Sequence, residues 1–288
     1  MIPTANIKNI PSINANFKLA YPFPIDEILT KGLSIENRED VHKLILSLID
    51  LTTLEGADTN KKIDELCKTV LAIEHQKEIP NVAAICVYPT FAKVVSESLA
   101  NTKVKTACVA GAFPSGQSPI EIKLSEVKWA IDQGATEIDM VISRGKLLEG
   151  NYQEVFDEIV AIKRCCGAIH LKVIIESGEL QNNKNIRIAS DLAMYAGADF
   201  IKTSTGKISE GATYNSVYIM LCAIKDFNTA QGVKIGMKAA GGISDISTAI
   251  NYLKLVENIV GKDWLNSKLF RFGASRLAKE ILTELSEK

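Results

Sequence analysis

Three lysines lie inside short apolar segments of this 288-residue chain, where charged side chains are unexpected. They are Lys172 in HLKVIIE, Lys202 in DFIKTST and Lys238 in IGMKAAG. Burial disfavours the charged form of an amine and lowers its pKa, so the neutral, nucleophilic form becomes accessible. A neutral amine can attack a carbonyl carbon and form a Schiff base. These lysines are therefore candidates for covalent chemistry on an aldehyde or ketone.

Carboxylates occur in segments of the same kind. Asp139 lies in EIDMVIS, and Asp50 is expected to close the strand SLIDL. Side chains alternate between the two faces of a strand, so Asp139 shares a face with Glu137. The same alternation places Lys172 and Glu176 together on one face of HLKVIIE. A carboxylate beside a nucleophilic amine can accept and return protons, which is general acid–base catalysis.

Strand-like segments alternate with amphipathic helical segments eight times, with short connections and no break in composition. The strand candidates are SLIDL, VAAICVY, VKTACVA, EIDMVIS, HLKVIIE, DFIKTST, IGMKAAG and LFRFGA. Parallel strands buried on both faces have this composition, and eight βα units predict an α/β fold, the single (β/α)8 TIM barrel. The rival fold, an open doubly wound sheet, would need a GxGxxG motif after its first strand, which is missing here.

The region before the first strand is expected to lie outside the barrel repeat. Residues 26–47 predict one or two extra N-terminal helices, which we expect to cover the bottom of the barrel. We therefore divide the chain into an N-terminal arm, residues 1–35, and a barrel domain, residues 36–288.

A closed barrel would bring the lysines and aspartates together in its interior. Lysines on neighbouring strands, about 6–7 Å apart, repel by about 2.5 kcal/mol at an effective dielectric of about 20. Repulsion and burial both lower the pKa of one amine. The same groups could instead form a purely structural network of ion pairs. The positions of Lys202 and Lys238 near the carboxyl ends of adjacent strands favour an active site, because barrel enzymes act at that face.

Glycine-containing turns are expected after the sixth, seventh and eighth strands. Their residues are Gly206, Lys207, Gly241, Gly242, Gly273, Ala274 and Ser275. Barrel enzymes bind phosphate with the loops after the last two strands, through backbone N–H groups at a helix N-terminus. Each glycine alone could mark a simple tight turn. Three such turns after consecutive strands predict a phosphate pocket.

Composition excludes several classes of partner. The 33 basic and 34 acidic side chains give a net charge of −1, so we expect no general affinity for nucleic acid or for a membrane surface. The chain shows neither a membrane-spanning apolar run nor a secretory signal pattern, and we expect a cytoplasmic protein. Its six cysteines and three histidines lack metal-ligand spacing, so we expect no metal and no cofactor.

Seven segments together resemble the deoxyribose-phosphate aldolase family. They are DLTTL, AAICVYP, EIDMVI, LKVIIESGEL, ADFIKTSTGK, MKAAGG and RFGAS. The resemblance runs from about Asp50 to the last helix, and FIKTSTGK followed one strand later by KAAGG is its most specific part. It implies a metal-free barrel aldolase that interconverts 2-deoxy-D-ribose 5-phosphate with glyceraldehyde 3-phosphate and acetaldehyde through a lysine Schiff base. It also implies a homodimer.

The resemblance implies a role for each matching residue. Lys202 would form the imine with the substrate carbonyl, and Lys238 would lower the pKa of Lys202. Asp139, with an ordered water, would move protons, and Lys172 and Asp50 would position this relay. The glycine turns and the lysine beside them would hold the phosphate.

The chain departs from this family at the phosphate pocket. A basic residue commonly follows the glycine pair of the seventh strand in the family, whereas this chain has Ser244. A small residue commonly follows RFGAS, whereas this chain has Arg276. We therefore expect Arg276 to supply part of the positive charge that holds the phosphate.

Two other functions stay open. Another Schiff-base sugar-phosphate aldolase, or a transaldolase, would share Lys202 and differ in its donor substrate. A catalytically silent barrel would bind sugar phosphates without reacting. The combination of Lys202, Lys238 and Asp139 argues against the silent barrel.

Overall fold

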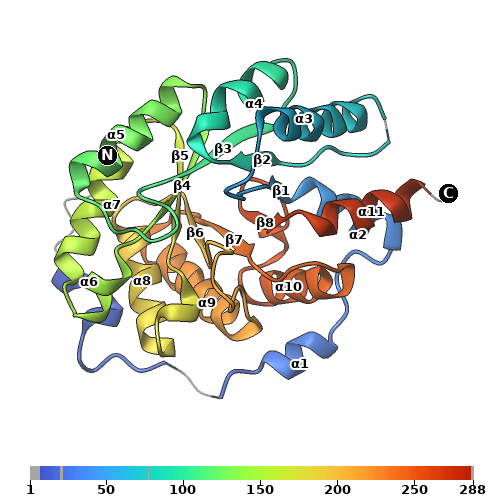
Figure 1. The fold of residues 1–288 in the computed structure, drawn as a ribbon. Coiled ribbons are helices and arrows are strands. Elements are labelled where there is room, and N and C mark those ends of the chain that lie inside the picture. The colour runs from blue at the N-terminus through green and yellow to red at the C-terminus, as the bar shows by residue number, and fades with distance from the viewer. Residues whose placement is uncertain (1–6, 20–21, 77, 287–288) are drawn as a thin grey trace.

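Eight parallel strands pair in chain order, and the last pairs with the first, so the sheet closes on itself (Figure 1). The computed structural model describes residues 7–19, 22–76 and 78–286. The strands are β1 (Ile49–Thr52), β2 (Ala84–Val87), β3 (Lys105–Ala110), β4 (Glu137–Val141), β5 (His170–Ile174), β6 (Phe200–Lys202), β7 (Gly236–Ala240) and β8 (Phe270–Ala274). Each lies within an expected strand segment or overlaps it, so the expected (β/α)8 barrel is confirmed.

A ring of helices surrounds the barrel (Figure 1). It comprises α3 (Asn60–Glu74), α4 (Ala92–Ser98), α5 (Ile120–Asp132), α6 (Arg144–Leu148), α7 (Tyr152–Cys166), α8 (Asn183–Tyr195), α9 (Tyr214–Gln231), α10 (Ile246–Ile259) and α11 (Arg276–Ser286). Gly134 and Gly197 follow α5 and α8 with φ of 98° and 96°, a conformation that favours glycine and ends a helix. Within the described part of the chain, no helix has the length and apolar character needed to cross a membrane.

The N-terminal helices pack on this outer ring. They are α1 (Ile25–Thr30) and α2 (Arg38–Ser47), preceded by the short 3-10 turns η1 (Ile7–Asn9) and η2 (Pro11–Ile13). The main contacts of α1 are with α10, those of α2 are with α11 and α10, and η2 packs on α8. Extra N-terminal helices are thus confirmed, but the expectation that they cover the bottom of the barrel is wrong. Their apolar side chains find partners on the outer helices instead. The domain division at residue 35 stays a prediction.

The two faces of the sheet differ sharply in polarity. Side chains such as Ile138, Met140 and Val173 face outward and join the large apolar cluster formed with the helices. Inside the barrel, β2 and β3 contribute a small separate apolar cluster that includes Cys86, Ala107 and Val109. The other six strands place charged side chains in the interior. Ionised groups in a barrel core must be paired or functional, so this interior is where a site is expected.

Candidate active site

Strand register brings the predicted lysines and Asp139 to adjacent positions. Lys202 of β6 is paired with Lys238 of β7, and Asp139 of β4 is paired with Lys172 of β5. Alternation along each strand turns these four side chains toward the barrel axis. All four are buried, with at most 2% of each residue exposed. The structure therefore brings together the residues that the sequence pattern predicted to meet.

Asp139 is the centre of this cluster. Its Oδ2 accepts hydrogen bonds from the Nζ atoms of Lys202 and Lys238, each at 2.8 Å, and its Oδ1 accepts one from Lys172 at 2.9 Å. Burial alone would raise the pKa of Asp139, but the three ammonium groups outweigh it and hold the pKa well below its usual range. Asp139 is therefore an ionised carboxylate in direct contact with the candidate nucleophile.

A second group of charged side chains contacts the lysines of the Asp139 cluster. Lys238 Nζ forms an ion pair with Asp50 Oδ2 at 2.6 Å, and Lys172 Nζ donates to Glu137 Oε2 at 2.5 Å. Arg271 of β8 contacts both of these carboxylates, at 2.5 Å from Asp50 and 3.0 Å from Glu137. Asp50 is the second residue of β1, so the expectation that it closes the strand is wrong. Because Asp50 stands near the amino end of β1, its carboxylate reaches both Arg271 and Lys238.

Sequence reasoning missed Arg271. The signal was present, because Arg271 stands two residues before Gly273 and therefore shares its inward face. Without Arg271, Asp50 and Glu137 would each lose one of their cationic partners. With it, both Asp50 and Glu137 are paired on two sides.

The pKa values of Lys202 and Lys238 shift in opposite directions. Burial lowers the pKa of Lys202, the nearby Lys238 ammonium lowers it further, and Asp139 opposes both only in part, so the net pKa falls. Burial also acts on Lys238, but Asp139 and Asp50 outweigh it and raise the pKa of Lys238 well above the ordinary value. Of the two amines, Lys202 is thus the one whose pKa moves toward the neutral, nucleophilic form. Burial contributes more to this than repulsion does.

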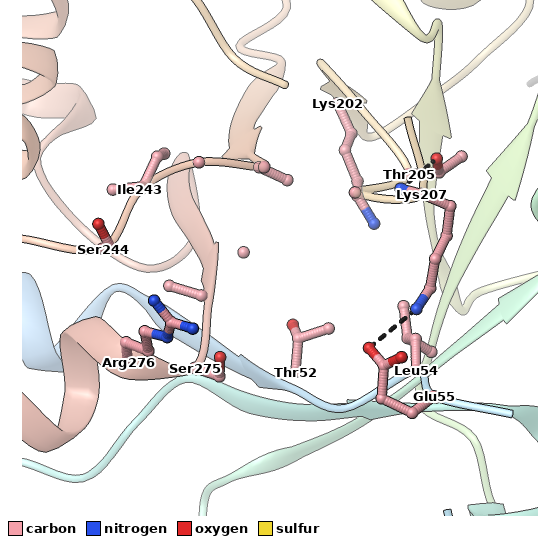
Figure 2. A pocket seen from close by; sticks show the side chains of 16 residues that line it. Thr52, Leu54, Glu55, Lys202, Thr205, Lys207, Ile243, Ser244, Ser275 and Arg276 are labelled. Carbon is pink, nitrogen blue, oxygen red and sulfur yellow. Dashed lines mark hydrogen bonds and ion pairs between the residues drawn. The ribbon is translucent and has the colours of Figure 1, made fainter. Parts of the chain in front are cut away.

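Lys202 is also the member of the network that faces open space. It lines a cavity of about 360 Å³ at the carboxyl ends of the strands, whereas Asp139, Lys238 and Lys172 lie beneath the lining. Figure 2 shows its amine reaching into this cavity from β6. A substrate carbonyl in the cavity would therefore meet Lys202 first.

The expected phosphate residues all line the same cavity. These are Gly206, Lys207, Gly241, Gly242, Gly273, Ala274, Ser275 and Arg276. Thr52, Leu54, Glu55, Thr205, Ala240, Ile243 and Ser244, together with Lys202, complete the lining. Of these seven, the sequence analysis placed Ser244 alone at the phosphate pocket. The carboxyl ends of β1, β6, β7 and β8 thus form one wall each of a single polar cavity.

Two cationic side chains stand on opposite sides of the cavity (Figure 2). Lys207 Nζ forms an ion pair with Glu55 Oε1 at 2.9 Å, which joins the β6 loop to the β1 loop. Arg276 opens α11 beside Ser275 and near Ser244. The charge of Lys207 is thus already partly balanced by a carboxylate. The side that carries Arg276 and two serines is the more favourable one for an anion.

Close packing explains the small residues of this wall. Gly241 and Gly242 have φ of 85° and 79°, which L side chains rarely adopt. Gly273 and Ala274 lie within β8 rather than after it, which corrects the predicted place of both. A Cβ on Gly273 would come within 2.8 Å of the Ala240 side chain and 3.1 Å of Lys238 Cε. Glycine at this position therefore leaves room for the Lys238 side chain.

Glu176 does not join the lysine network, so its predicted place beside Lys172 is wrong. β5 ends at Ile174, and Glu176 follows in a left-handed conformation with φ of 54°. This turn redirects its buried carboxylate to Thr205, whose backbone N–H donates to it at 2.9 Å and whose hydroxyl donates at 2.5 Å. The Thr205 hydroxyl in turn accepts from the backbone N–H of Lys207 at 3.1 Å. Glu176 thus holds the loop that carries Lys207.

Cys86 of β2 lies at the edge of the lysine network. The Cys86 thiol lies 3.9 Å from Asp139 Oδ2, and burial raises its pKa, so it is a thiol rather than a thiolate. Over residues 7–19, 22–76 and 78–286, no group of three or more histidine, cysteine, aspartate or glutamate side chains is arranged to hold a metal ion.

A closed parallel barrel with a low-pKa amine at its carboxyl-end cavity defines a (β/α)8-barrel enzyme. The family model of the DeoC/LacD family aldolases matches residues 44–258, and the chain belongs to this family.

Relatives and solved structures agree with this assignment. A protein of Homo sapiens named deoxyribose-phosphate aldolase is 42% identical over 248 residues, which cover 82% of this chain and 78% of the human one. A Caenorhabditis elegans protein is 42% identical over 254 residues, 88% of this chain and 84% of its own. The solved deoxyribose phosphate aldolase of Aeropyrum pernix is 27% identical, with a TM-score of 0.66, over 91% of this chain and 99% of the archaeal one.

Proposed function

We propose that this protein cleaves 2-deoxy-D-ribose 5-phosphate reversibly to glyceraldehyde 3-phosphate and acetaldehyde, through an imine on Lys202. The observation that carries the proposal is that Lys202 lines the cavity and has a lowered pKa, while the lysines that touch more carboxylates lie beneath it. The resemblance to deoxyribose-phosphate aldolases over most of the chain supplies the substrate.

The proposed reaction begins with attack of the neutral Lys202 amine on the C1 aldehyde of the open-chain sugar. Water leaves the resulting carbinolamine, and a protonated imine forms at C1. The C3 hydroxyl then loses its proton, the C2–C3 bond breaks, and its electron pair moves into the imine to give an enamine. Glyceraldehyde 3-phosphate departs. Protonation of the enamine at C2 and hydrolysis of the imine release acetaldehyde and free Lys202.

Asp139 is the proposed proton carrier in these steps. Its Oδ2 lies 2.8 Å from Lys202 Nζ, so a proton can pass between the amine and the carboxylate. Lys238 and Lys172 hold the two oxygens of Asp139 in place and oppose any permanent uptake of that proton. Asp50 holds Lys238 in turn.

The phosphate is proposed to bind on the side of the cavity that carries Arg276. Backbone N–H groups of Gly206, Gly241 and Gly242, with Ser275, would complete its surroundings. Because the acetaldehyde fragment offers few polar groups, most of the binding energy must come from the phosphate end. Lys207 adds positive charge from the opposite wall.

Borohydride trapping tests the proposal. The protein is incubated with deoxyribose 5-phosphate and sodium borohydride, digested, and mapped by peptide mass. We expect a reduced adduct on Lys202 and none in a Lys202→Met variant. An adduct on Lys238 or Lys172 would keep the aldolase but overturn the role of Lys202. A folded protein that binds the sugar phosphate and forms no adduct would indicate a silent binding barrel.

The donor substrate is tested separately. Another Schiff-base aldolase or a transaldolase would pass the trapping test as well. We expect synthesis with acetaldehyde as donor and glyceraldehyde 3-phosphate as acceptor, and no comparable rate with dihydroxyacetone. A preference for dihydroxyacetone would overturn the proposed substrate and leave the imine intact.

We also propose that the protein is a homodimer that works in the cytoplasm. Its six cysteines are all free, and four are buried, which fits a reducing compartment. The dimer rests on the resemblance to the aldolase family. Light scattering during size-exclusion chromatography would give the mass of the particle, and a monomer at micromolar concentration would contradict the dimer.

A further inference from the structure

Arg271 has no part in the reaction described above, yet it is built into the centre of the barrel. It is 4% exposed and does not line the cavity, so it cannot touch the substrate. Its guanidinium contacts Asp50 and Glu137, its Nε donates to the carbonyl of Ser267, and it lies 5.8 Å from the centre of the Phe200 ring. A buried guanidinium held on so many sides has a fixed charge in a fixed place.

The interior charges can be counted strand by strand over the described residues. They are Asp50 from β1, Glu137 and Asp139 from β4, Lys172 from β5, Lys202 from β6, Lys238 from β7 and Arg271 from β8. From β2, the uncharged thiol of Cys86 faces the interior. From β3, the small apolar residues Ala107 and Val109 face the interior. With every amine protonated, four cations would face three carboxylates. The network would then carry one positive charge in excess.

A buried surplus charge is costly, and the least costly relief is the loss of one proton. Arg271 cannot lose a proton, because a guanidinium stays protonated in proteins. Lys172 touches three carboxylates and Lys238 touches two. Lys202 touches Asp139 alone and lines the cavity, where water can accept the proton.

We infer that Arg271 is a positioning residue that supplies the surplus charge of this network and thereby makes Lys202 the amine that stays neutral. Arg271 acts through Asp50 and Glu137, which it partly neutralises, so that these carboxylates hold Lys238 and Lys172 without also stabilising a charged Lys202. The inference rests on the proposed function in one respect, the assignment of Lys202 as the nucleophile. It predicts that the total charge of the network decides the protonation of Lys202.

Charge-changing variants test this directly. Arg271→Met removes one positive charge and leaves three cations facing three carboxylates, so Lys202 keeps its proton to higher pH. Glu137→Gln removes one negative charge and has the opposite effect. The double variant restores the surplus of one. At an effective dielectric of about 20, a unit charge changes the proton affinity of an amine about tenfold at a separation of about 12 Å and by more at shorter range. Each single variant should therefore shift the pH profile by about one unit or more.

The measurement is kcat/KM for deoxyribose 5-phosphate cleavage as a function of pH, together with the rate of borohydride trapping of acetaldehyde on Lys202. The acidic limb is the pH range over which kcat/KM falls as the solution becomes more acidic. We expect it to move to higher pH in Arg271→Met and to lower pH in Glu137→Gln. In the double variant it should return to its wild-type position. Arg271→Lys should keep the wild-type limb. Arg187→Met is the matched control, since Arg187 is a buried arginine on α8 that pairs with Asp191 and Asp226. It should lower thermal stability and leave the limb in place.

The outcomes separate the inference from the function on which it rests. A wild-type protein without a trapped adduct on Lys202 would refute the proposed function. A wild-type adduct on Lys202 with the same acidic limb in both single variants would overturn the role of Arg271 and leave it a structural residue. If Arg271→Met does not fold, Glu137→Gln still tests the inference, because it must move the limb in the opposite direction.

Discussion

Lys202 and Lys238 are register partners on neighbouring strands and donate to the same carboxylate oxygen, yet the pKa values of their amines move in opposite directions. Their distances to Asp139 Oδ2 are equal, 2.8 Å each. The difference comes from Asp50, which pairs with Lys238 at 2.6 Å. One additional carboxylate thus helps to raise the pKa of Lys238, while the pKa of Lys202 is lowered.

Removing the charge of Lys238 should make Lys202 a poorer nucleophile. In Lys238→Met, three cations face three carboxylates, so Lys202 retains its proton at neutral pH. We expect kcat/KM at pH 7 to fall at least about tenfold and to recover partly at alkaline pH, with trapping still on Lys202. Lys123→Met is the control, because Lys123 is equally buried but pairs with Glu158 outside the barrel interior. An identical pH profile for both variants would show that Lys238 acts only through stability.

Replacing Asp139 should affect catalysis and stability together. Asp139→Asn removes the negative charge that three lysines share, and breaking such a buried pair costs about 3–5 kcal/mol of unfolding free energy. It also removes the proposed proton carrier, for which we expect a loss of about 10²–10⁴ in kcat. Single-turnover imine trapping and urea unfolding would measure the two effects. Slow imine formation in a folded variant would support the catalytic role, and normal trapping would contradict it.

The sequence predicted the barrel and most of the cluster because both rest on strict periodicity. Alternation along a strand placed Asp139, Lys172, Lys202 and Lys238 inward, and chain order placed their strands next to one another. Two backbone facts were not readable in the same way. β1 begins at Ile49, so Asp50 stands near the amino end of the strand rather than at its carboxyl end. The left-handed turn at Glu176 breaks the alternation of side chains that follows from β5. Loop contacts such as Glu55 with Lys207 depend on tertiary packing and have no local sequence signal.

Arg276 should replace the basic residue that the family commonly has at the position of Ser244. Arg276→Ala removes a charge-assisted contact worth about 1.5–3 kcal/mol, so we expect KM for deoxyribose 5-phosphate to rise about tenfold or more with little change in kcat. Cleavage of unphosphorylated deoxyribose is the control and should be unaffected. A Ser244→Arg change in the Arg276→Ala background should restore affinity. Unchanged affinity in Arg276→Ala would refute this role.

Glu176 should govern the order of the loop that carries Lys207. Glu176→Gln retains the size of the side chain and weakens the bonds to both the N–H and the hydroxyl of Thr205. We expect KM to rise several-fold and the melting temperature to fall, because a hydrogen bond to a charged group contributes about 1.5–3 kcal/mol. Thr205→Val removes the same hydroxyl from the other side. If the two changes are coupled, the double variant should lose less than the sum of the single losses.

The pH dependence of the wild-type protein follows from two lowered pKa values, that of Lys202 and that of Asp139, which act in different pH windows. The active form of Lys202 is neutral, so activity should rise with pH through its lowered folded-state pKa. In the window between that pKa and the unfolded value of about 10.4, the unfolded chain binds more protons, so this lysine makes stability rise with pH as well. The pKa of Asp139 is lowered, and its contribution to stability is present above about pH 4 and lost as pH falls further.

Denaturant unfolding across pH, beside the activity profile, would test this separation. We expect activity to disappear at a pH where the protein is still folded, and unfolding to follow only in more acidic solution. Lys202→Met should abolish activity and remove the alkaline rise in stability, because a thioether does not titrate. Activity and folding lost at the same pH would mean that the acidic limb reports unfolding. The protonation of Lys202 would then have no part in setting that limb.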